Sequence, residues 1–145
     1  MSNDTIRVGV IGCGGFGQFA LQHFTQVEGV ALTGMAGTQR EAAYRAAQRF
    51  DIPDIVEPEA LVQQKDVDLV YIATPPFLHH EQTMLALNAG KHVIVEKPTA
   101  LTLDEADEML AAARERELLL ATNLMQRYNP MYETIGRLIE SKVLG

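Results

Sequence analysis

A glycine-rich segment near the start of the chain has the spacing Gly-x-Gly-x-x-Gly: Gly12, Cys13, Gly14, Gly15, Phe16 and Gly17. It follows a short apolar run and precedes apolar residues with helical spacing. In such a turn the first glycine permits a tight bend, the second lets the backbone approach a diphosphate, and the third lets helix and strand pack closely. The diphosphate would lie at the helix N-terminus, which favours anions. This context favours a dinucleotide site over a glycine turn without a ligand.

The residues after the next apolar run indicate which dinucleotide would bind. About 20 residues past the glycines, NAD sites usually carry an Asp or Glu that holds the ribose hydroxyls. Here the chain has Ala36, Gly37 and Thr38 instead. No carboxylate repels a 2′-phosphate, and Thr38 and Arg40 offer a hydroxyl and a guanidinium to bind one. These residues favour NADP over NAD, unless Thr38 only caps a helix and Arg40 is a solvated surface residue.

The cysteine and the histidines predict little further chemistry. Cys13 is the only cysteine, so the chain has no internal disulfide, and a small residue that fills the turn is the simpler interpretation than a reactive thiol. His79 and His80 are adjacent, and neighbouring helical side chains point in different directions. No cysteines or carboxylates at metal-ligand spacing accompany them, so we expect no metal site. At the start of a helix they are better interpreted as ribose contacts or caps.

Composition and charge exclude several classes of protein. The 145 residues, 47% of them apolar, suit one globular domain. A formal net charge of -7 leaves no basic stripe for a nucleic-acid partner. No apolar run approaches the length of a bilayer span, and residues 1–7 do not resemble a signal peptide. We therefore expect a cytoplasmic protein with neither a membrane nor a nucleic-acid partner.

Strands and helices alternate along the chain. Apolar runs predict strands at residues 6–11, 30–36, 69–73, 92–95 and 118–121, and a further short strand with a short helix between residues 51 and 64. Helices are expected from Phe16, with Phe16, Phe19, Ala20 and Phe24 on one face, and over 78–89, closed by Gly90. Capping boxes at 38–41 and 102–105 begin two more helices. This pattern predicts an α/β fold of the Rossmann type, a doubly wound parallel sheet with helices on both faces.

Three segments resemble one family when they are taken together: the glycine turn, residues 73–79 (Ala-Thr-Pro-Pro-Phe-Leu-His) and residues 90–98 (Gly-Lys-His-Val-Ile-Val-Glu-Lys-Pro). Their order and spacing, followed by Arg-Tyr-Asn-Pro at 127–130, resemble the glucose-fructose oxidoreductase and inositol dehydrogenase (Gfo/Idh/MocA) family over nearly the whole chain. This chain differs from the family at Gly37, where the family usually has an Asp. The family's preference for NAD therefore does not carry over to this chain.

The resemblance implies roles for particular residues. Thr74, Pro76 and His79 would line the nicotinamide-ribose side of the cofactor site, together with Ala73. Glu96 and Lys97 would face the reacting end of the cofactor, and Pro98 would follow a cis peptide bond. Lys97 is then the expected catalytic residue, which exchanges the proton of a hydroxyl group while a hydride moves to or from the nicotinamide.

The implied function is hydride transfer between NAD or NADP and a sugar, a polyol or a related hydroxy or carbonyl compound. The alternatives are a non-catalytic NADP(H) sensor, or another two-domain enzyme such as a relative of biliverdin reductase. We expect residues 1–122 to form the nucleotide-binding domain and residues 123–145 to lead toward an α+β substrate domain that is absent from the sequence.

A helix near the end of the chain has an apolar stripe of Met131, Ile135, Leu138 and Ile139. We expect this stripe to pack against another copy of the chain or to fray. We also expect the chain alone to bind nucleotide with little or no turnover.

Overall fold

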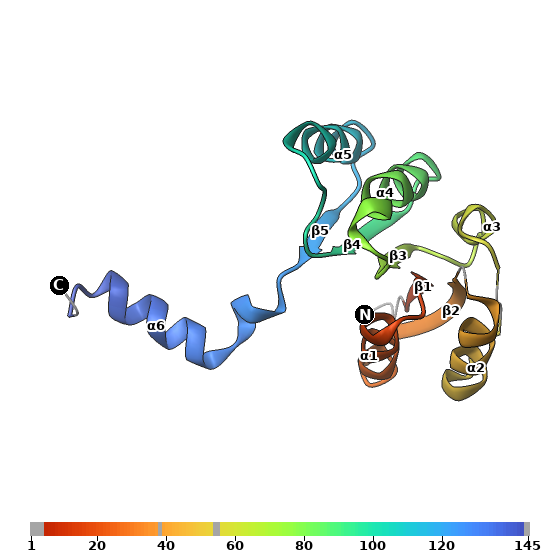
Figure 1. Ribbon diagram of the computed structural model, residues 1–145, viewed down its shortest axis with the longest axis horizontal. Coiled ribbons are helices and arrows are strands. Elements are labelled where there is room, and N and C mark those ends of the chain that lie inside the picture. The colour runs from red at the N-terminus through yellow and green to blue at the C-terminus, as the bar shows by residue number, and fades with distance from the viewer. Residues whose placement is uncertain (1–4, 38, 54–55, 144–145) are drawn as a thin grey trace.

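The computed structural model describes residues 5–37, 39–53 and 56–143. Five strands form one sheet in the order β2-β1-β3-β4-β5, with every neighbouring pair parallel. The strands are β1 (Ile6–Ile11), β2 (Val30–Ala36), β3 (Leu69–Ile72), β4 (His92–Glu96) and β5 (Leu120–Asn123). The chain order reverses between β1 and β3. The predicted doubly wound parallel fold is therefore confirmed (Figure 1).

Helices cover both faces of this sheet because its strands carry apolar side chains on both sides. The helices are α1 (Gly15–Phe24), α2 (Arg40–Phe50), α3 (Pro58–Val62), α4 (His79–Asn88), α5 (Leu103–Glu115) and α6 (Pro130–Glu140), with short 3-10 turns at Pro76–Leu78 and Met125–Tyr128. Successive side chains of β3 point to opposite faces of the sheet. Ile72 packs beneath α3, α4 and α5, whereas Tyr71 packs beneath α1 and α2. Two separate cores result, one on each face.

The ends of the helices agree with the sequence in two places and differ in one. The capping box is present at the start of α5, where Thr102 and Glu105 satisfy each other's backbone N–H groups. Gly90, just beyond α4, has a φ of 75°, as expected at the end of a helix. Helix α2 instead begins at Arg40 with Gln39 as its N-cap and without a side-chain cap, and Thr38 lies outside the described residues.

Three other expectations need correction. The described residues between 51 and 64 contain α3 but no strand, although the Val56 amide donates to the Met35 carbonyl as a strand residue would. On α1 the buried positions are Gly17, Ala20 and Leu21, whereas Phe16 and Phe19 are about half exposed. The helix is thus rotated from the expected face, because Gly17 must lie against the sheet. Strand β5 begins two residues later than expected.

Helix α6 extends away from the sheet and buries none of its residues (Figure 1). Its predicted apolar stripe is present and exposed. No helix within the described residues is both long enough and apolar enough to cross a bilayer.

Candidate functional site

A cavity of about 450 Å³ opens at the carboxyl ends of β1, β3 and β4. In a doubly wound sheet this edge, at the point where the strand order reverses, is where ligands bind. The strand register brings the ends of these strands level, with Ile11 opposite Ile72 and Ile72 opposite Val95. Residues far apart in sequence therefore meet around one space, and they are Gly12 to Phe16, Gly37, Gln39, Ala73 to Pro76, Glu96 and Lys97.

The glycines of the turn have different structural roles. Gly12 has a φ of 108°, and a Cβ there would lie 2.7 Å from the backbone carbonyl of Ala73. A Cβ on Gly17 would lie 2.0 Å from the carbonyl oxygen of Gly12, so only glycine lets α1 approach β1 this closely. Gly14 and Gly15 face open space. The first and third glycines are required by the fold, and the middle ones leave room above the N-terminus of α1 for a diphosphate.

Gly37 and Cys13 fit together at the base of the turn. A Cβ on Gly37 would lie 2.7 Å from the Sγ atom of Cys13. Cys13 is buried, and this burial raises the pKa of its thiol. The thiol therefore acts as packing, as the simpler interpretation of the sequence had it. An Asp at position 37 would therefore require Cys13 to shift, which gives a steric reason for the missing carboxylate.

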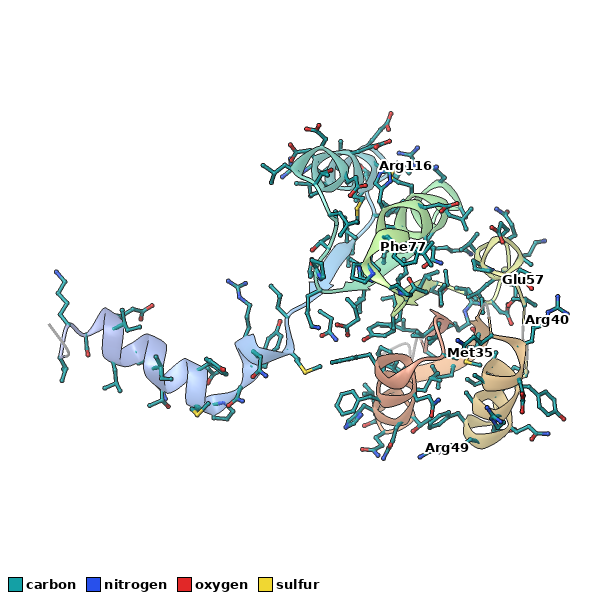
Figure 2. All side chains as sticks on the ribbon, viewed as in Figure 1. Met35, Arg40, Arg49, Glu57, Phe77 and Arg116 are labelled. Carbon is teal, nitrogen blue, oxygen red and sulfur yellow. The ribbon has the colours of Figure 1, made fainter. Side chains whose placement is uncertain are left out.

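Arg40 lies beside the main cavity and not in its wall. It lines a second hollow of about 440 Å³, together with Tyr44, Glu57 and Gly37, and Gly37 belongs to both spaces. An Arg40 guanidinium nitrogen lies 3.2 Å from a carboxylate oxygen of Glu57, and the Arg40 side chain is 87% exposed. Figure 2 shows the two side chains together at the outer edge of the molecule. Such an exposed pair is weak. Gln39 lines the main cavity here, and Thr38 is not among the described residues.

His79 supports the cavity wall from behind. The residue is 1% exposed and is absent from the lining, contrary to the expectation that it lines the nicotinamide-ribose side. Its Nδ1 atom lies 2.6 Å from the Pro98 carbonyl oxygen and its Nε2 atom 2.9 Å from the Thr74 carbonyl oxygen. His79 thus ties the loop after β3 to the loop after β4. Thr74 and Pro76 do line the cavity, as does Ala73.

Lys97 is exposed at the mouth of the cavity, directly after β4. Its Nζ atom lies 4.9 Å from the centroid of the Phe16 ring, a distance at which an ammonium group is attracted to an aromatic face. The Lys97-Pro98 peptide bond is cis, as expected. Lys97 and the glycine turn, which are 80 residues apart, therefore meet at one point.

Glu96 is buried beside Lys97, yet its carboxylate binds other groups. One oxygen accepts hydrogen bonds from the Tyr71 hydroxyl and, at 2.6 Å, from the Asn123 amide. The other accepts from the Lys97 backbone N–H at 3.3 Å. Burial, and then the hydrogen bond to Glu96, raise the pKa of the Tyr71 phenol. The phenol therefore remains a protonated donor.

Sequence reasoning missed Tyr71 and Asn123. The signal for Tyr71 is a tyrosine within an aliphatic buried strand, because a buried hydroxyl group needs a partner. The signal for Asn123 is a polar residue at the end of the adjacent edge strand.

Known proteins resemble this chain in sequence and in structure. A dTDP-3,4-didehydro-2,6-dideoxy-alpha-D-glucose 3-reductase of Actinomadura kijaniata is 36% identical over 141 residues, which are 97% of this chain and 42% of the relative. A 1,5-anhydro-D-fructose reductase of Ensifer adhaerens is 48% identical over 85 residues, or 59% of this chain and 25% of the relative. The chain thus spans less than half the length of these relatives.

A solved structure of a 3-ketoreductase from Actinomadura kijaniata, in complex with TDP-benzene and NADP, superposes with a TM-score of 0.89 at 36% identity, covering 95% of this chain and 44% of that one. The model of the oxidoreductase family with an NAD-binding Rossmann fold matches residues 6–124. The glycine turn, the aligned ends of β1, β3 and β4 and Lys97 surround one cavity. Together with these matches, they show that this chain belongs to the Gfo/Idh/MocA oxidoreductase family.

Proposed function

We propose that this chain is the nucleotide-binding half of an NAD(P)-dependent oxidoreductase that transfers a hydride between a nicotinamide and a sugar, a polyol or a related hydroxy or carbonyl compound. The observation that carries the proposal is the cavity that joins the glycine turn to Lys97. The open space above Gly14 and Gly15, at the N-terminus of a ten-residue helix, fits a diphosphate. From there the cavity leads past Ala73 and Thr74 to Glu96 and Lys97.

When bound, the nicotinamide ring supplies the hydride acceptor or donor. The residues of the chain bind the cofactor and move the proton. The backbone of the glycine turn would hold the diphosphate, and Thr74 and Pro76 would line the ribose next to the ring. In the direction of reduction, the Lys97 ammonium group donates a proton to the carbonyl oxygen. In the direction of oxidation, its amine accepts the proton of the hydroxyl group.

We propose NADP as the preferred cofactor. The end of β2 has Gly37 where a ribose-binding carboxylate would stand, and Arg40 lies in the adjoining hollow. Because its pair with Glu57 is exposed and weak, the guanidinium can turn toward a 2′-phosphate at little cost. The similar 3-ketoreductase is in complex with NADP, which supports the same choice.

The substrate class follows from the relatives and from the exposure of Lys97. Two relatives are reductases of sugar carbonyl groups. We propose a sugar-like carbonyl compound, with its remaining contacts supplied by a domain outside this sequence. The chain alone then binds nucleotide with little turnover, because Lys97 lies exposed at the cavity mouth in the part of the chain that the structure describes. The retained Lys97 favours this enzyme over the non-catalytic NADP(H) sensor.

Calorimetric titration of the chain with NADP⁺ and with NAD⁺ tests the proposal. We expect both to bind, with NADP⁺ the tighter. Tighter binding of NAD⁺ would keep the dehydrogenase and refute the role of Arg40. Absence of binding by either would refute the nucleotide site of the chain. Oxidation of NADPH in the presence of keto sugars, followed by absorbance, is expected to stay near background for this chain alone.

A further inference from the structure

Glu96 and Lys97 are neighbours in sequence, but their side chains do not form an ion pair with each other. Neighbouring Glu and Lys side chains on an exposed loop commonly form an ion pair, which would occupy the amine that the proposed reaction needs. Within the described parts of the chain, Lys97 forms no ion pair. Its ammonium group lies over Phe16 at the cavity mouth instead.

The carboxylate is held elsewhere by donors from three places. The Tyr71 hydroxyl reaches it from β3, the Asn123 amide from the end of β5, and the Lys97 backbone N–H from the start of the following loop. The Asn123 amide also donates to the Tyr71 hydroxyl oxygen at 3.2 Å, so the two donors support each other. Glu96 itself is only 5% exposed.

Both donors lie outside the wall of the cavity. Tyr71 is 3% exposed, its ring packs edge-on against Phe24 beneath α1, and neither Tyr71 nor Asn123 lines the cavity. A buried carboxylate without donors would be costly, so it would turn toward the nearest cation if these two were lost. The next residue, Lys97, carries such a cation on a flexible side chain.

We propose that Tyr71 and Asn123 are positioning residues for Lys97. By binding one carboxylate oxygen of Glu96 from two flanking strands, they hold the carboxylate in the sheet and keep the Lys97 amine available at the cavity mouth. The inference rests on the proposed role of Lys97 in proton transfer. It extends that role to two residues outside the cavity wall.

The test measures how available the Lys97 amine is, and it needs neither cofactor nor turnover. The chain is acetylated with a limiting amount of N-acetoxysuccinimide, and mass spectrometry gives the rate at Lys97 relative to Lys65 and Lys142 in the same sample. We compare wild type with Tyr71→Phe, which keeps the ring on Phe24, and with Asn123→Ala. Tyr44→Phe is the matched control, because Tyr44 is half exposed on α2 and its hydroxyl bonds only Gln48 among the described residues.

We expect the relative rate at Lys97 to fall about threefold in both variants, as a new ion pair at the exposed cavity mouth allows. The rate should stay unchanged in Tyr44→Phe. Adding Glu96→Gln to either variant removes the competing charge and should restore the rate. A merely structural defect would not be restored in this way. If Tyr71→Phe does not fold, the comparison of Asn123→Ala with and without Glu96→Gln tests the proposal.

An unchanged rate at Lys97 in the folded variants, or a fall that Glu96→Gln does not restore, would overturn the inference. The result is independent of the calorimetric titration. Failure of the chain to bind a dinucleotide refutes the proposed function while the acetylation result still reports on the positioning of Lys97.

Discussion

At the scale of single residues, the glycine turn separates requirements of the fold from requirements of binding. Gly17 has no room for a Cβ, whereas Gly14 has open space around it. We expect Gly17→Ala to destabilise the chain by about 3 kcal/mol, the upper range for overpacking a tight contact. We expect Gly14→Ala to keep the melting temperature of wild type and to weaken NADP⁺ binding roughly tenfold, or about 1.4 kcal/mol, because the methyl group enters the diphosphate space.

Thermal unfolding, monitored by circular dichroism, measures the stability of both variants, and calorimetric titration measures their affinity for NADP⁺. If Gly14→Ala binds NADP⁺ as tightly as wild type, the diphosphate does not lie where we place it.

Arg40 and Glu57 provide a second test at this scale. Arg40→Gln should weaken NADP⁺ binding about tenfold and leave NAD⁺ binding unchanged, since a hydrogen bond to a charged group contributes roughly 1.5 kcal/mol or more. Glu57→Gln should strengthen NADP⁺ binding slightly, because it removes both the competing partner of Arg40 and a negative charge near the phosphate. Titration of both variants with both cofactors measures these effects. Equal losses for NAD⁺ and NADP⁺ in Arg40→Gln would count against a phosphate contact.

At the scale of elements, Arg7 of β1 and Asp68, just before β3, join two central strands. The hydrogen bond from the Arg7 side chain lowers the pKa of Asp68 from 3.8 to about 2. A carboxyl group whose pKa is lowered on folding stabilises the folded state above its unfolded pKa and loses this effect as the pH falls through its folded pKa. The contribution is therefore complete above about pH 4 and declines between about pH 4 and pH 2.

We expect Asp68→Asn to have a lower melting temperature than wild type at pH 7, and we expect the difference to shrink as the pH falls toward 3. Because both side chains are more than a third exposed, the effect should be small. The exposed neighbour Asp66 provides the control variant Asp66→Asn, which removes a charge without breaking the pair. A difference that is constant from pH 7 to pH 3 would contradict the role of the pair.

At the scale of the whole molecule, the apolar stripe that the sequence predicted on α6 is present and exposed to solvent. Exposed stripes of this kind usually pack against another surface. If a second copy covers this one, the chain should dimerise with increasing concentration, and replacing Ile135 and Ile139 with Glu should keep it monomeric. Sedimentation velocity over a range of concentrations distinguishes the dimer from the monomer. A wild-type chain that stays monomeric throughout, with α6 intact by circular dichroism, would refute self-association.

The sequence determined most of the fold because its signals are local. The five strands and six α-helices of the described residues follow from apolar runs and helical spacing, although the sequence also predicted a strand between residues 51 and 64 that these residues lack. Gly90 and Thr102 mark helix ends through chemistry confined to a single turn. The glycine turn and Lys97 could be recognised for the same reason, since each lies in a short segment of characteristic residues. The predicted face of α1 was right for Ala20 and Phe24 but wrong for Phe16 and Phe19, because contact with the sheet at Gly17 sets the rotation of that helix.

Only the tertiary structure decided which side chains act together. It placed His79 behind the cavity wall, moved Arg40 into an adjoining hollow, and brought Tyr71 and Asn123 to Glu96 across 25 and 27 residues of chain. These pairings depend on strand order and register, because residues on neighbouring strands come within hydrogen-bonding distance only after the sheet has formed. The sequence alone therefore determined the elements and the glycine turn, whereas long-range packing decided how the carboxylate beside Lys97 is held.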